Sequence, residues 1–395
     1  MLLALAAGCA SPPVVAPAAA KPESPAVGGN EASLLVDGPV THRSMFEAMA
    51  AARNHINLET YILEEGELAE RLATLLEKKA RAGVHVQVMY DSLGSFGTPR
   101  EYFERLREAG IKVCEFNPVE RVGKINHRDH RKTLIVDGRV AFTGGINVSE
   151  AYAKSSRAAR RTPQKETKEG WRDTQVRVAG PGAAQFQRLY LDTWDKHCGA
   201  PAGAQYFPQP APRGDKTVRL LKGSPEGGSE MYTALLAAIG EARGRVWLTF
   251  GYFVPDPRIK QALIDAARRG VDVQLVLPGY SDFWAPVNAG RSHYEQLLAA
   301  GVKIHEWDQA LMHAKTALID ARWSSVGSTN LDWRSFAHNY EADLIVYGEG
   351  FASEMEQRFR LDVKAAKHID ADEWTRRGAK QKLKEWVARQ WEYLL

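Results

Sequence analysis

Two segments of the sequence carry the same residue types at the same spacing. Each follows the pattern HxKxxxxD and, after six further residues, GxxN. With 11 histidines in the chain, a chance HxKxxxxD is expected only roughly 0.03–0.05 times. Two copies with the same tail therefore indicate one functional unit that is present twice. The residues concerned are His130, Lys132, Asp137, Gly144, Gly145 and Asn147 in the first copy, and His313, Lys315, Asp320, Gly327, Ser328 and Asn330 in the second.

Histidine, lysine and asparagine in this arrangement suit the chemistry of a phosphodiester. Ammonium and amide groups hold the nonbridging oxygens and stabilise the charge of a five-coordinate phosphorus. A neutral imidazole can attack phosphorus and form a phosphohistidine, while a protonated imidazole can donate to the leaving oxygen, an effect worth ~10²–10⁴-fold. Because the lysines supply positive charge, this chemistry needs neither a metal nor another cofactor. We expect substrate to contact Gly145, Asn147, Ser328 and Asn330.

Each histidine–lysine pair stands at the start of an apolar, β-rich run, Lys132–Val136 in the first copy and Lys315–Ile319 in the second. Residues two apart on a strand point to the same face, so each histidine should project beside its lysine. Asp137 and the glycine after it predict a hairpin. We expect Asp137 and Asp320 to stabilise the hairpins rather than contact substrate. Folding the two copies face to face would place both sets around one cleft.

The elements that position these motifs are duplicated as well. A helix, a glycine and an alternating strand follow one another over residues 72–88, and again over residues 263–276. A second such unit over residues 106–113 matches one over residues 297–304. This alternation of helix and strand patterns predicts an α/β fold in which each half is a sandwich of helices and a sheet.

Changes in composition mark the boundaries of the halves. Residues 201–215 are rich in Pro and small residues and have no helical period, which predicts a linker. The N-terminal domain is then expected at residues 31–200 and the C-terminal domain at residues 216–370. Residues 1–30 should lie outside the fold, and residues 371–395 should form a C-terminal amphipathic helix.

The first 30 residues look like an export leader. Met1–Ala7 is a short apolar run, and Leu5–Cys9 resembles a bacterial lipobox, in which the cysteine is lipidated after cleavage. This resemblance predicts Cys9 as a lipid anchor, residues 10–30 as a flexible tether, and an exported lipoprotein at a membrane of the bacterial cell envelope. An ordinary cleaved signal or an unstructured leader is the alternative. No run reaches the ~18 apolar residues of a membrane span.

The motif segments also resemble a known family. They match the HKD signature of the phospholipase D superfamily and, within it, are most similar to bacterial cardiolipin synthases, over about residues 34–370. The segments that carry the similarity are Asn126–Lys132, Gly144–Asn147, Tyr252–Asp256 and Gly327–Ser335. The resemblance implies two tandem phospholipase D-like α-β-α sandwich domains that form one pseudo-symmetric active site. It also implies that His130 is the nucleophile and His313 the general acid.

In that superfamily a carboxylate downstream of each motif orients the motif's histidine. Asp173 matches this place after the first motif, and Glu341 matches it after the second. Each would hold its imidazole in one tautomer. The activity implied is phosphatidyl transfer, in which phosphatidylglycerol loads a phosphatidyl group onto His130 and a second phospholipid alcohol accepts it.

Other functions fit the same motifs. Water could take the place of the alcohol, which would give a phospholipase D-type hydrolase. A nuclease is less favoured, because Lys plus Arg is 52 against 48 for Asp plus Glu, a net charge of only +4. A purely lipid-binding protein would need neither histidine. His127 and His130 form an HxxH pair that could bind a metal, but no other Cys or His has ligand spacing.

The overall composition is that of an ordinary globular protein, with 44% hydrophobic and 25% charged residues. This excludes a disordered chain, a collagen and a disulfide-stapled miniprotein. One Cys114–Cys198 bridge is possible, although Cys114 also suits a small buried position. The expected partners are phospholipid substrates and a membrane surface, not nucleic acid, and the chain is expected to act as a monomer.

Two surface segments have two interpretations each. The basic run over residues 154–168 is either a solvated loop or a contact for anionic headgroups. The C-terminal segment carries apolar side chains at helical spacing with lysines between them, which suits either a membrane interface or packing on the domain body. Its apolar residues are Leu383, Trp386, Val387, Trp391 and Leu394.

Overall fold

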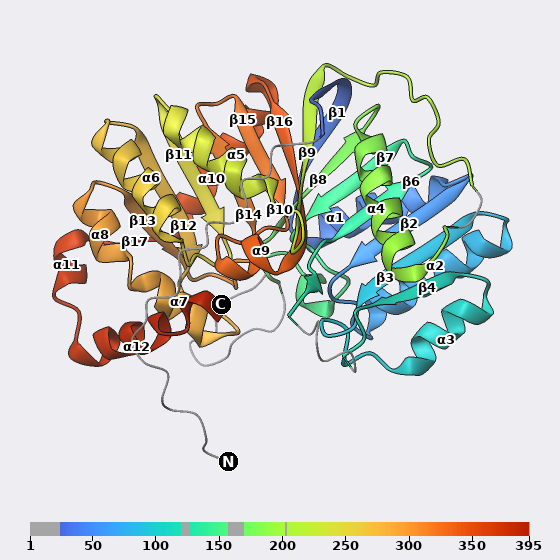
Figure 1. The fold of residues 1–395 in the computed structure, drawn as a ribbon, viewed down its shortest axis with the longest axis horizontal. Helices are drawn as coiled ribbons and strands as arrows, with labels where there is room; N and C mark the ends of the chain where they lie inside the picture. The colour runs from blue at the N-terminus through green and yellow to red at the C-terminus, as the bar shows by residue number, and fades with distance from the viewer. Residues whose placement is uncertain (1–23, 120–125, 157–169, 202–203, 395) are drawn as a thin grey trace, which may run out of the picture.

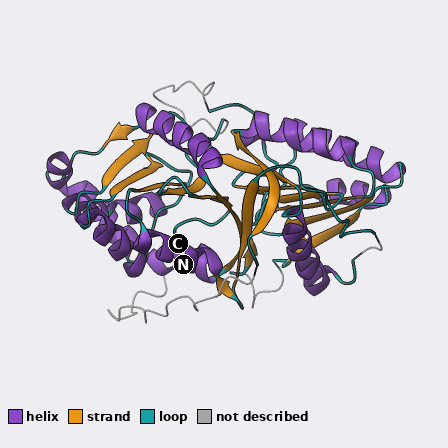
Figure 2. Cartoon of the chain, turned by 90° about the horizontal axis from the view of Figure 1, so that it is seen from above, coloured by secondary structure: helices purple, strands orange, loops and turns teal. Residues whose placement is uncertain are grey.

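The computed structural model describes residues 24–119, 126–156, 170–201 and 204–394. The chain folds into two halves that lie side by side, the N-terminal half on the right of Figure 1 and the C-terminal half on the left. In each half the strands form a central layer with helices on both faces, as Figure 2 shows from above. The predicted α/β class and the predicted duplication are confirmed.

The sheet of the N-terminal half has the strand order β1-β8-β7-β6-β2-β3-β4. Strands β2, β3 and β4 run parallel to one another, and all other neighbours are antiparallel. The helix–strand alternation in the sequence therefore corresponds to the parallel strands β2, β3 and β4, and the antiparallel strands complete the sheet. The strands are β1 (Val27–Val36), β2 (His55–Thr60), β3 (His85–Asp91), β4 (Lys112–Phe116), β6 (Thr133–Val136), β7 (Val140–Gly144) and β8 (Thr174–Ala179).

The sheet of the C-terminal half repeats this order as β9-β16-β15-β14-β11-β12-β13, with β17 added at the edge. Each strand thus has a counterpart in the first sheet. The strands are β9 (Lys216–Ser224), β11 (Arg245–Phe250), β12 (Asp272–Pro278), β13 (Lys303–Trp307), β14 (Lys315–Ile319), β15 (Trp323–Gly327), β16 (Asn339–Tyr347) and β17 (Lys367–His368), with a short β10 (Gly228–Ser229) paired to β9.

Helices cover both faces of each sheet. In the N-terminal half, α1 to α3 share one apolar cluster with the sheet, and α4 packs on the other face. These helices are α1 (Gly38–Ala51), α2 (Glu67–Arg81), α3 (Arg100–Glu108) and α4 (Ala183–Cys198), with the 3₁₀ helix η2 (Glu150–Tyr152). The helices of the C-terminal half are α5 (Glu230–Glu241), α6 (Pro257–Arg268), α7 (Trp284–Arg291), α8 (Tyr294–Ala299), α9 (Trp333–Ala337), α10 (Glu349–Ala365), α11 (Ala371–Thr375), α12 (Ala379–Arg389) and the 3₁₀ helix η3 (Glu392–Leu394).

The two halves share a core. Phe116 and Tyr190 of the first half belong to the same buried cluster as Trp247 and Phe359 of the second. Backbone pairing joins the halves as well, because β1 pairs with β9, and the short strand β5 (Arg128–Asp129) pairs in parallel with β16. The seam between the halves is therefore a rigid place in which to build a site.

Both ends of the fold differ from the sequence prediction. Residues 27–30 were expected in the leader, but they belong to β1, where Val27 pairs with Val218 and Asn30 with Lys216. Residues 371–395 were expected to form one helix, but α11 and α12 are separate. The break falls at Gly378, which precedes α12 and whose backbone freedom disfavours a continuous helix. The lipobox and Cys9 lie outside the described residues, as do residues 157–168 of the basic run.

The possible disulfide is present. Cys114 lies within β4, and it is bonded to Cys198 at the end of α4, 84 residues further on. The bond ties the edge of the first sheet to the helix that covers its inner face. The linker region is also partly anchored, because Tyr206 is buried and its hydroxyl donates to Gln87 at 2.7 Å.

Candidate active site

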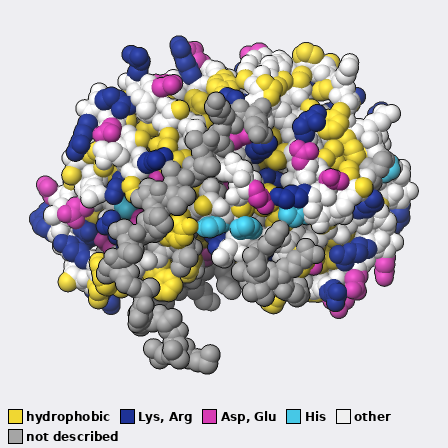
Figure 3. Space-filling model, in the orientation of Figure 1, with side chains coloured by type: hydrophobic (Ala, Val, Ile, Leu, Met, Phe, Trp, Pro, Cys, Tyr) yellow, Lys and Arg dark blue, Asp and Glu magenta, His cyan; other side chains and the backbone are white. Residues whose placement is uncertain are grey.

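Both motifs meet at one cavity on the seam between the halves. The cavity measures about 340 Å³, and its lining includes His130, Asn147, His313 and Asn330. Histidine side chains are visible near the middle of the face shown in Figure 3, between the two halves. The expectation that the two copies face one another around a single cleft is confirmed.

Each histidine is held by the carboxylate of the other half. Nδ1 of His130 lies 3.0 Å from Oε1 of Glu341, and Nδ1 of His313 lies 2.7 Å from Oδ2 of Asp173. Each carboxylate was expected to orient the histidine of its own motif, and that prediction was wrong. In both cases Nδ1 is the engaged nitrogen, which leaves Nε2 for the substrate.

The crossing follows from how the backbones dock. The His130 amide donates to the carbonyl of Tyr340 at 3.0 Å, so the first motif runs along the start of β16. The His313 amide donates to the carbonyl of Arg172 at 2.8 Å, so the second motif runs along the segment before β8. The residues just before each histidine thus pair with the other half next to its carboxylate, β5 with β16 and Met312 with Arg172.

The two lysines are buried behind the histidines. The ammonium group of Lys132 donates to the carbonyl of His130, and that of Lys315 donates to the carbonyl of His313. Each lysine thus accompanies its histidine, as the two-residue spacing predicted, although the histidines precede strands β6 and β14 rather than belonging to them. Burial lowers the pKa of Lys132 to about 7 and that of Lys315 to about 8.

Burial also shifts the pKa values of the other acids and bases around the cavity. It lowers the pKa of His130 well below its usual value, and the charges of Lys132 and Lys315 act in the same direction. Burial and the charge of Lys315 also lower the pKa of His313, and the Asp173 carboxylate opposes that shift by its charge and its hydrogen bond. Burial raises the pKa of Glu341 to about 7. Burial thus disfavours the charged forms of both the lysines and Glu341, and an anionic ligand beside the lysines would favour their protonated forms.

Gly145 and Ser328 lie behind the cavity rather than on it. A Cβ at Gly145 would overlap the Asp173 carboxylate, so glycine is required for the close approach of that acid. Ser328 is buried and donates from Oγ to Glu341. These two residues were expected to contact substrate, but their positions make them supports for the carboxylates, whereas Asn147 and Asn330 line the cavity.

The hairpin aspartates lie away from the cavity. Asp137 accepts hydrogen bonds from the backbone amides of Arg53, Asn54 and His55 at 2.8–2.9 Å. Asp320 does the same for the amides of residues 243–245 at 2.7–2.9 Å. Both adopt positive φ, 52° and 50°. This geometry agrees with the expected structural role.

Comparison with known proteins decides the family. The model described as "Cardiolipin synthase, PLD-like domain" matches residues 45–158 and 235–363. The chain belongs to the cardiolipin synthase family. A protein named cardiolipin synthase from Alkalihalophilus pseudofirmus is 32% identical over 349 residues, which cover 86% of this chain and 67% of that protein. A protein of the same name from a Geobacillus species is 32% identical over 375 residues, 93% of this chain and 73% of that one.

Solved structures support the fold. The phosphatidylserine synthase of Haemophilus influenzae superposes with a TM-score of 0.69 at 13% identity, covering 94% of this chain and 98% of that one. A polyphosphate kinase from Porphyromonas gingivalis gives a TM-score of 0.55 at 18% identity, covering 84% of this chain and 50% of the kinase. The cardiolipin synthase-like chain therefore has the fold that the motifs implied.

Two tyrosines at the site were not found from the sequence of this family member. The ring of Tyr61 packs edge-on against His130, with centroids 5.0 Å apart. Oη of Tyr152 lies 3.0 Å from Nδ1 of His313. Tyr152 stands five residues after Asn147, where the second copy has Ser335, so an alignment of the copies beyond GxxN would have singled it out.

A second cavity adjoins the first on the His313 side. It measures about 720 Å³ and shares Ile62, Trp171 and Asp282 with the histidine cavity. Trp171 packs against the His313 ring with centroids 5.4 Å apart. The two cavities thus meet at the residue next to His313.

Among residues 24–119, 126–156, 170–201 and 204–394, no group of three His, Cys, Asp or Glu side chains could hold a metal ion. His127 stacks on His338 with centroids 6.4 Å apart, while His130 is engaged by Glu341. No helix in the described part of the chain has the length and apolar character needed to cross a bilayer.

Proposed function

We propose that this member of the cardiolipin synthase family transfers a phosphatidyl group from one phosphatidylglycerol to the primary hydroxyl of a second, forming cardiolipin and glycerol. The observation that carries the proposal is the pair of histidines across one cavity, each with Nδ1 held by a carboxylate and Nε2 available. This arrangement supplies one nucleophile and one acid–base group on opposite sides of a phosphorus atom.

In the first step Nε2 of His130 attacks phosphorus, and the bond from phosphorus to the glycerol oxygen breaks. Nε2–H of His313 gives its proton to that oxygen, so glycerol leaves as a neutral alcohol. In the second step a hydroxyl of the acceptor lipid gives its proton to His313 and attacks phosphorus. The phosphorus–nitrogen bond then breaks and restores neutral His130. Lys132, Lys315, Asn147 and Asn330 stabilise the charge on the nonbridging oxygens.

The surroundings of the two histidines support these roles. A nucleophile must be neutral, and the pKa of His130 is lowered by burial and by both lysines. An acid must keep a proton; burial and the charges of Lys315 and Lys132 lower the pKa of His313, and the Asp173 carboxylate opposes that shift. An anionic substrate in the cavity offsets the lysine charges and so favours the protonated form of His313.

The second cavity is our proposed route for the alcohols. In an in-line displacement the leaving oxygen departs opposite the attacking nitrogen, on the side of His313. The second cavity opens on that side beside Trp171. Glycerol would leave through it and the acceptor hydroxyl would enter by the same route.

Cardiolipin synthases are membrane-associated, and we propose that this chain is an exported lipoprotein anchored at Cys9 and active as a monomer. The Cys114–Cys198 disulfide supports export, because such bonds persist in oxidising compartments. The monomer is supported by the two halves of one chain supplying both histidines of a single cavity.

The deciding experiment is product analysis by mass spectrometry with phosphatidylglycerol in mixed micelles and no added metal. Cardiolipin and glycerol are expected from the wild type and from His368→Ala, a control at an exposed histidine on β17. Neither product is expected from His130→Ala or His313→Ala. Phosphatidic acid as the sole product would make the protein a hydrolase, and cleavage of plasmid DNA without lipid turnover would make it a nuclease.

A further inference from the structure

Helix α12 packs on the body of the protein through its polar side. The buried residues of this helix are Glu385 and Ala388. Glu385 forms an ion pair with Arg377 at 2.8 Å, and Gln381 donates to Asn288 of α7 at 3.1 Å. A helix that served only to cover the domain would be expected to turn its apolar side inward.

The apolar side of α12 faces solvent instead. Leu383 is 60% exposed, Trp386 62%, Val387 37% and Trp391, just beyond the helix, 57%. At 100° per residue Leu383, Trp386 and Val387 lie together on α12, on the side away from Glu385 and Ala388. Basic side chains flank them, and the residues are Lys380, Lys382, Lys384 and Arg389.

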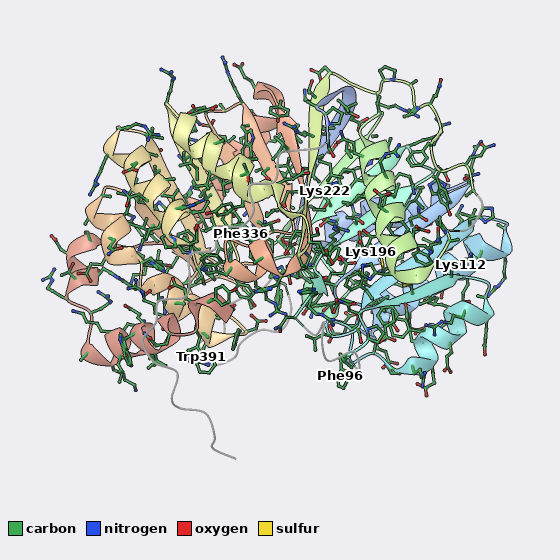
Figure 4. All side chains as sticks on the ribbon, viewed as in Figure 1. Phe96, Lys112, Lys196, Lys222, Phe336 and Trp391 are labelled. Carbon is green, nitrogen blue, oxygen red and sulfur yellow. A yellow bond between two sulfur atoms is a disulfide. The ribbon has the colours of Figure 1, made fainter. Side chains whose placement is uncertain are left out.

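Exposed aromatic side chains also stand at the histidine cavity and at the start of α7. Phe283 lines that cavity and is 48% exposed. Trp284 is 54% exposed at the start of α7, the helix on which α12 packs. Across the seam, Phe96 is 75% exposed on the loop that lines the second cavity. Trp391 and Phe96 both lie along the lower edge of the molecule in Figure 4.

We propose that Phe283, Trp284, Leu383, Trp386, Val387 and Trp391 form a docking face for an anionic phospholipid bilayer. Tryptophans favour the level of the headgroups, and flanking lysines are attracted to anionic lipid. With this face in the bilayer, the cavity mouth beside Phe283 lies where a phospholipid headgroup can enter without leaving the membrane. The proposal rests on the proposed function, since it assumes that the substrate is a membrane phospholipid.

The test is co-sedimentation with vesicles, using the full chain with Cys9→Ser throughout so that no lipid anchor contributes. The wild type is expected to bind vesicles of equal phosphatidylglycerol and phosphatidylcholine. The triple variant Leu383→Ser/Trp386→Ser/Trp391→Ser should bind them at least about tenfold more weakly. Leu361→Ser removes another exposed apolar side chain, from α10, and should bind like the wild type. Replacing Lys380, Lys382 and Lys384 by Gln should weaken binding only when phosphatidylglycerol is present.

A second measurement separates docking from catalysis. On monomeric short-chain phosphatidylglycerol the triple variant should turn over like the wild type, because Leu383, Trp386 and Trp391 do not line the histidine cavity. If no form of the protein acted on lipid, the proposed function would fail, yet sedimentation would still decide the docking face. Unchanged vesicle binding by the triple variant would overturn the proposal. So would a wild-type dimer that the triple variant converts to a monomer without loss of vesicle binding, because the face would then be covered by a second copy.

Discussion

The two halves of the molecule share a strand order and a hairpin geometry but differ around their histidines. In the first motif, the ring of Tyr61 packs against His130. By strand pairing, the equivalent place beside His313 is Gly251, where a Cβ would lie 2.8 Å from the His313 Cα. The carboxylates differ too. Glu341 has a raised pKa and accepts a hydrogen bond from Ser328, while Asp173 contacts Nδ1 of His313 together with the Tyr152 hydroxyl.

A further difference lies between each histidine and its lysine. Arg131 is buried in the first motif, where it contacts Glu59, Thr193 and the carbonyl of Glu341. The same place in the second motif is Ala314. Duplication thus supplies a symmetric frame, and the substitutions within that frame give the two imidazoles different environments and different proposed roles.

The largest expected effect comes from removing one histidine or the other. His130→Ala and His313→Ala should each lower turnover of phosphatidylglycerol by at least about 10³-fold. A phosphatidyl ester of p-nitrophenol needs no proton on its leaving oxygen. With this substrate His313→Ala should form and accumulate the phosphohistidine, visible by intact mass at alkaline pH, whereas His130→Ala should not. Accumulation in His130→Ala instead would reverse the two roles.

The crossed carboxylates give the next largest effect. Glu341→Gln should slow attack by His130 by about 10²-fold, because the imidazole loses the partner that fixes its tautomer. The measurement is phosphohistidine formation from the p-nitrophenyl ester in the His313→Ala background. In that background Asp173→Asn should change the rate of phosphohistidine formation little, because His313, the partner of Asp173, is already absent. A larger effect of Asp173→Asn than of Glu341→Gln would mean that each carboxylate serves its own motif.

Removing the disulfide should destabilise the N-terminal half more than the C-terminal half. The Cys114–Cys198 bond closes a loop that belongs wholly to the first half. Replacing both cysteines by Ser should cost about 2–5 kcal/mol of unfolding free energy. Amide hydrogen exchange should show the loss of protection mainly in β3 and β4 and less in β12 and β13. Equal losses in both sheets would show that the shared core makes the halves one cooperative unit.

Each buried lysine should lower the free energy of unfolding but support turnover, and both effects should be larger for Lys132 than for Lys315. Lys132→Met should raise the unfolding free energy at pH 7 by about 1–3 kcal/mol while lowering turnover at least about 10²-fold. The lowered pKa of Lys132, about 7 against 10.5, means that the unfolded chain binds more protons between these values. Wild-type stability should therefore gain from this group as pH rises through that window, and the advantage of Lys132→Met should shrink by pH 9.5. Denaturant titrations at both pH values check this, with a smaller effect expected for Lys315→Met.

The smallest effects are expected at the hairpin aspartates, where the halves are alike. Asp137→Asn and Asp320→Asn should each lower the unfolding free energy by about 1 kcal/mol, because one carboxylate oxygen becomes a donor facing backbone amides. Turnover should stay near wild type in both. A loss of activity at only one position, measured at equal folded fraction, would show that this hairpin also positions its histidine.

Much of the frame could be predicted from local patterns. Hairpin turns at Asp137 and Asp320, and helix–strand repeats such as α2–β3 and α6–β12, follow from short-range spacing that a sequence displays directly. The resemblance to the family also located the carboxylates Asp173 and Glu341. These predictions depend on contacts within a half, which the chain specifies over a few tens of residues.

The remaining features depend on how surfaces meet. Which carboxylate serves which histidine is decided by docking of the halves, and nothing in the spacing of Asp173 or Glu341 encodes it. Residues 27–30 were assigned to the leader because their neighbours are Pro- and Ala-rich, although β9 supplies their pairing partners. The α12 pattern showed an apolar side but not that Glu385 would face the body, since that requires Arg377 and α7.

The crossed pairing also sets when the protein becomes reactive. During synthesis the N-terminal half emerges first and can fold with its own sheet. His130 then has no Glu341 beside it, because that residue belongs to β16, one of the last strands to be made. His313 in turn meets Asp173 only when the second half docks. The nucleophile and its acid are therefore completed together, near the end of chain synthesis, so that a truncated chain carries an imidazole but not the site that would put it to use.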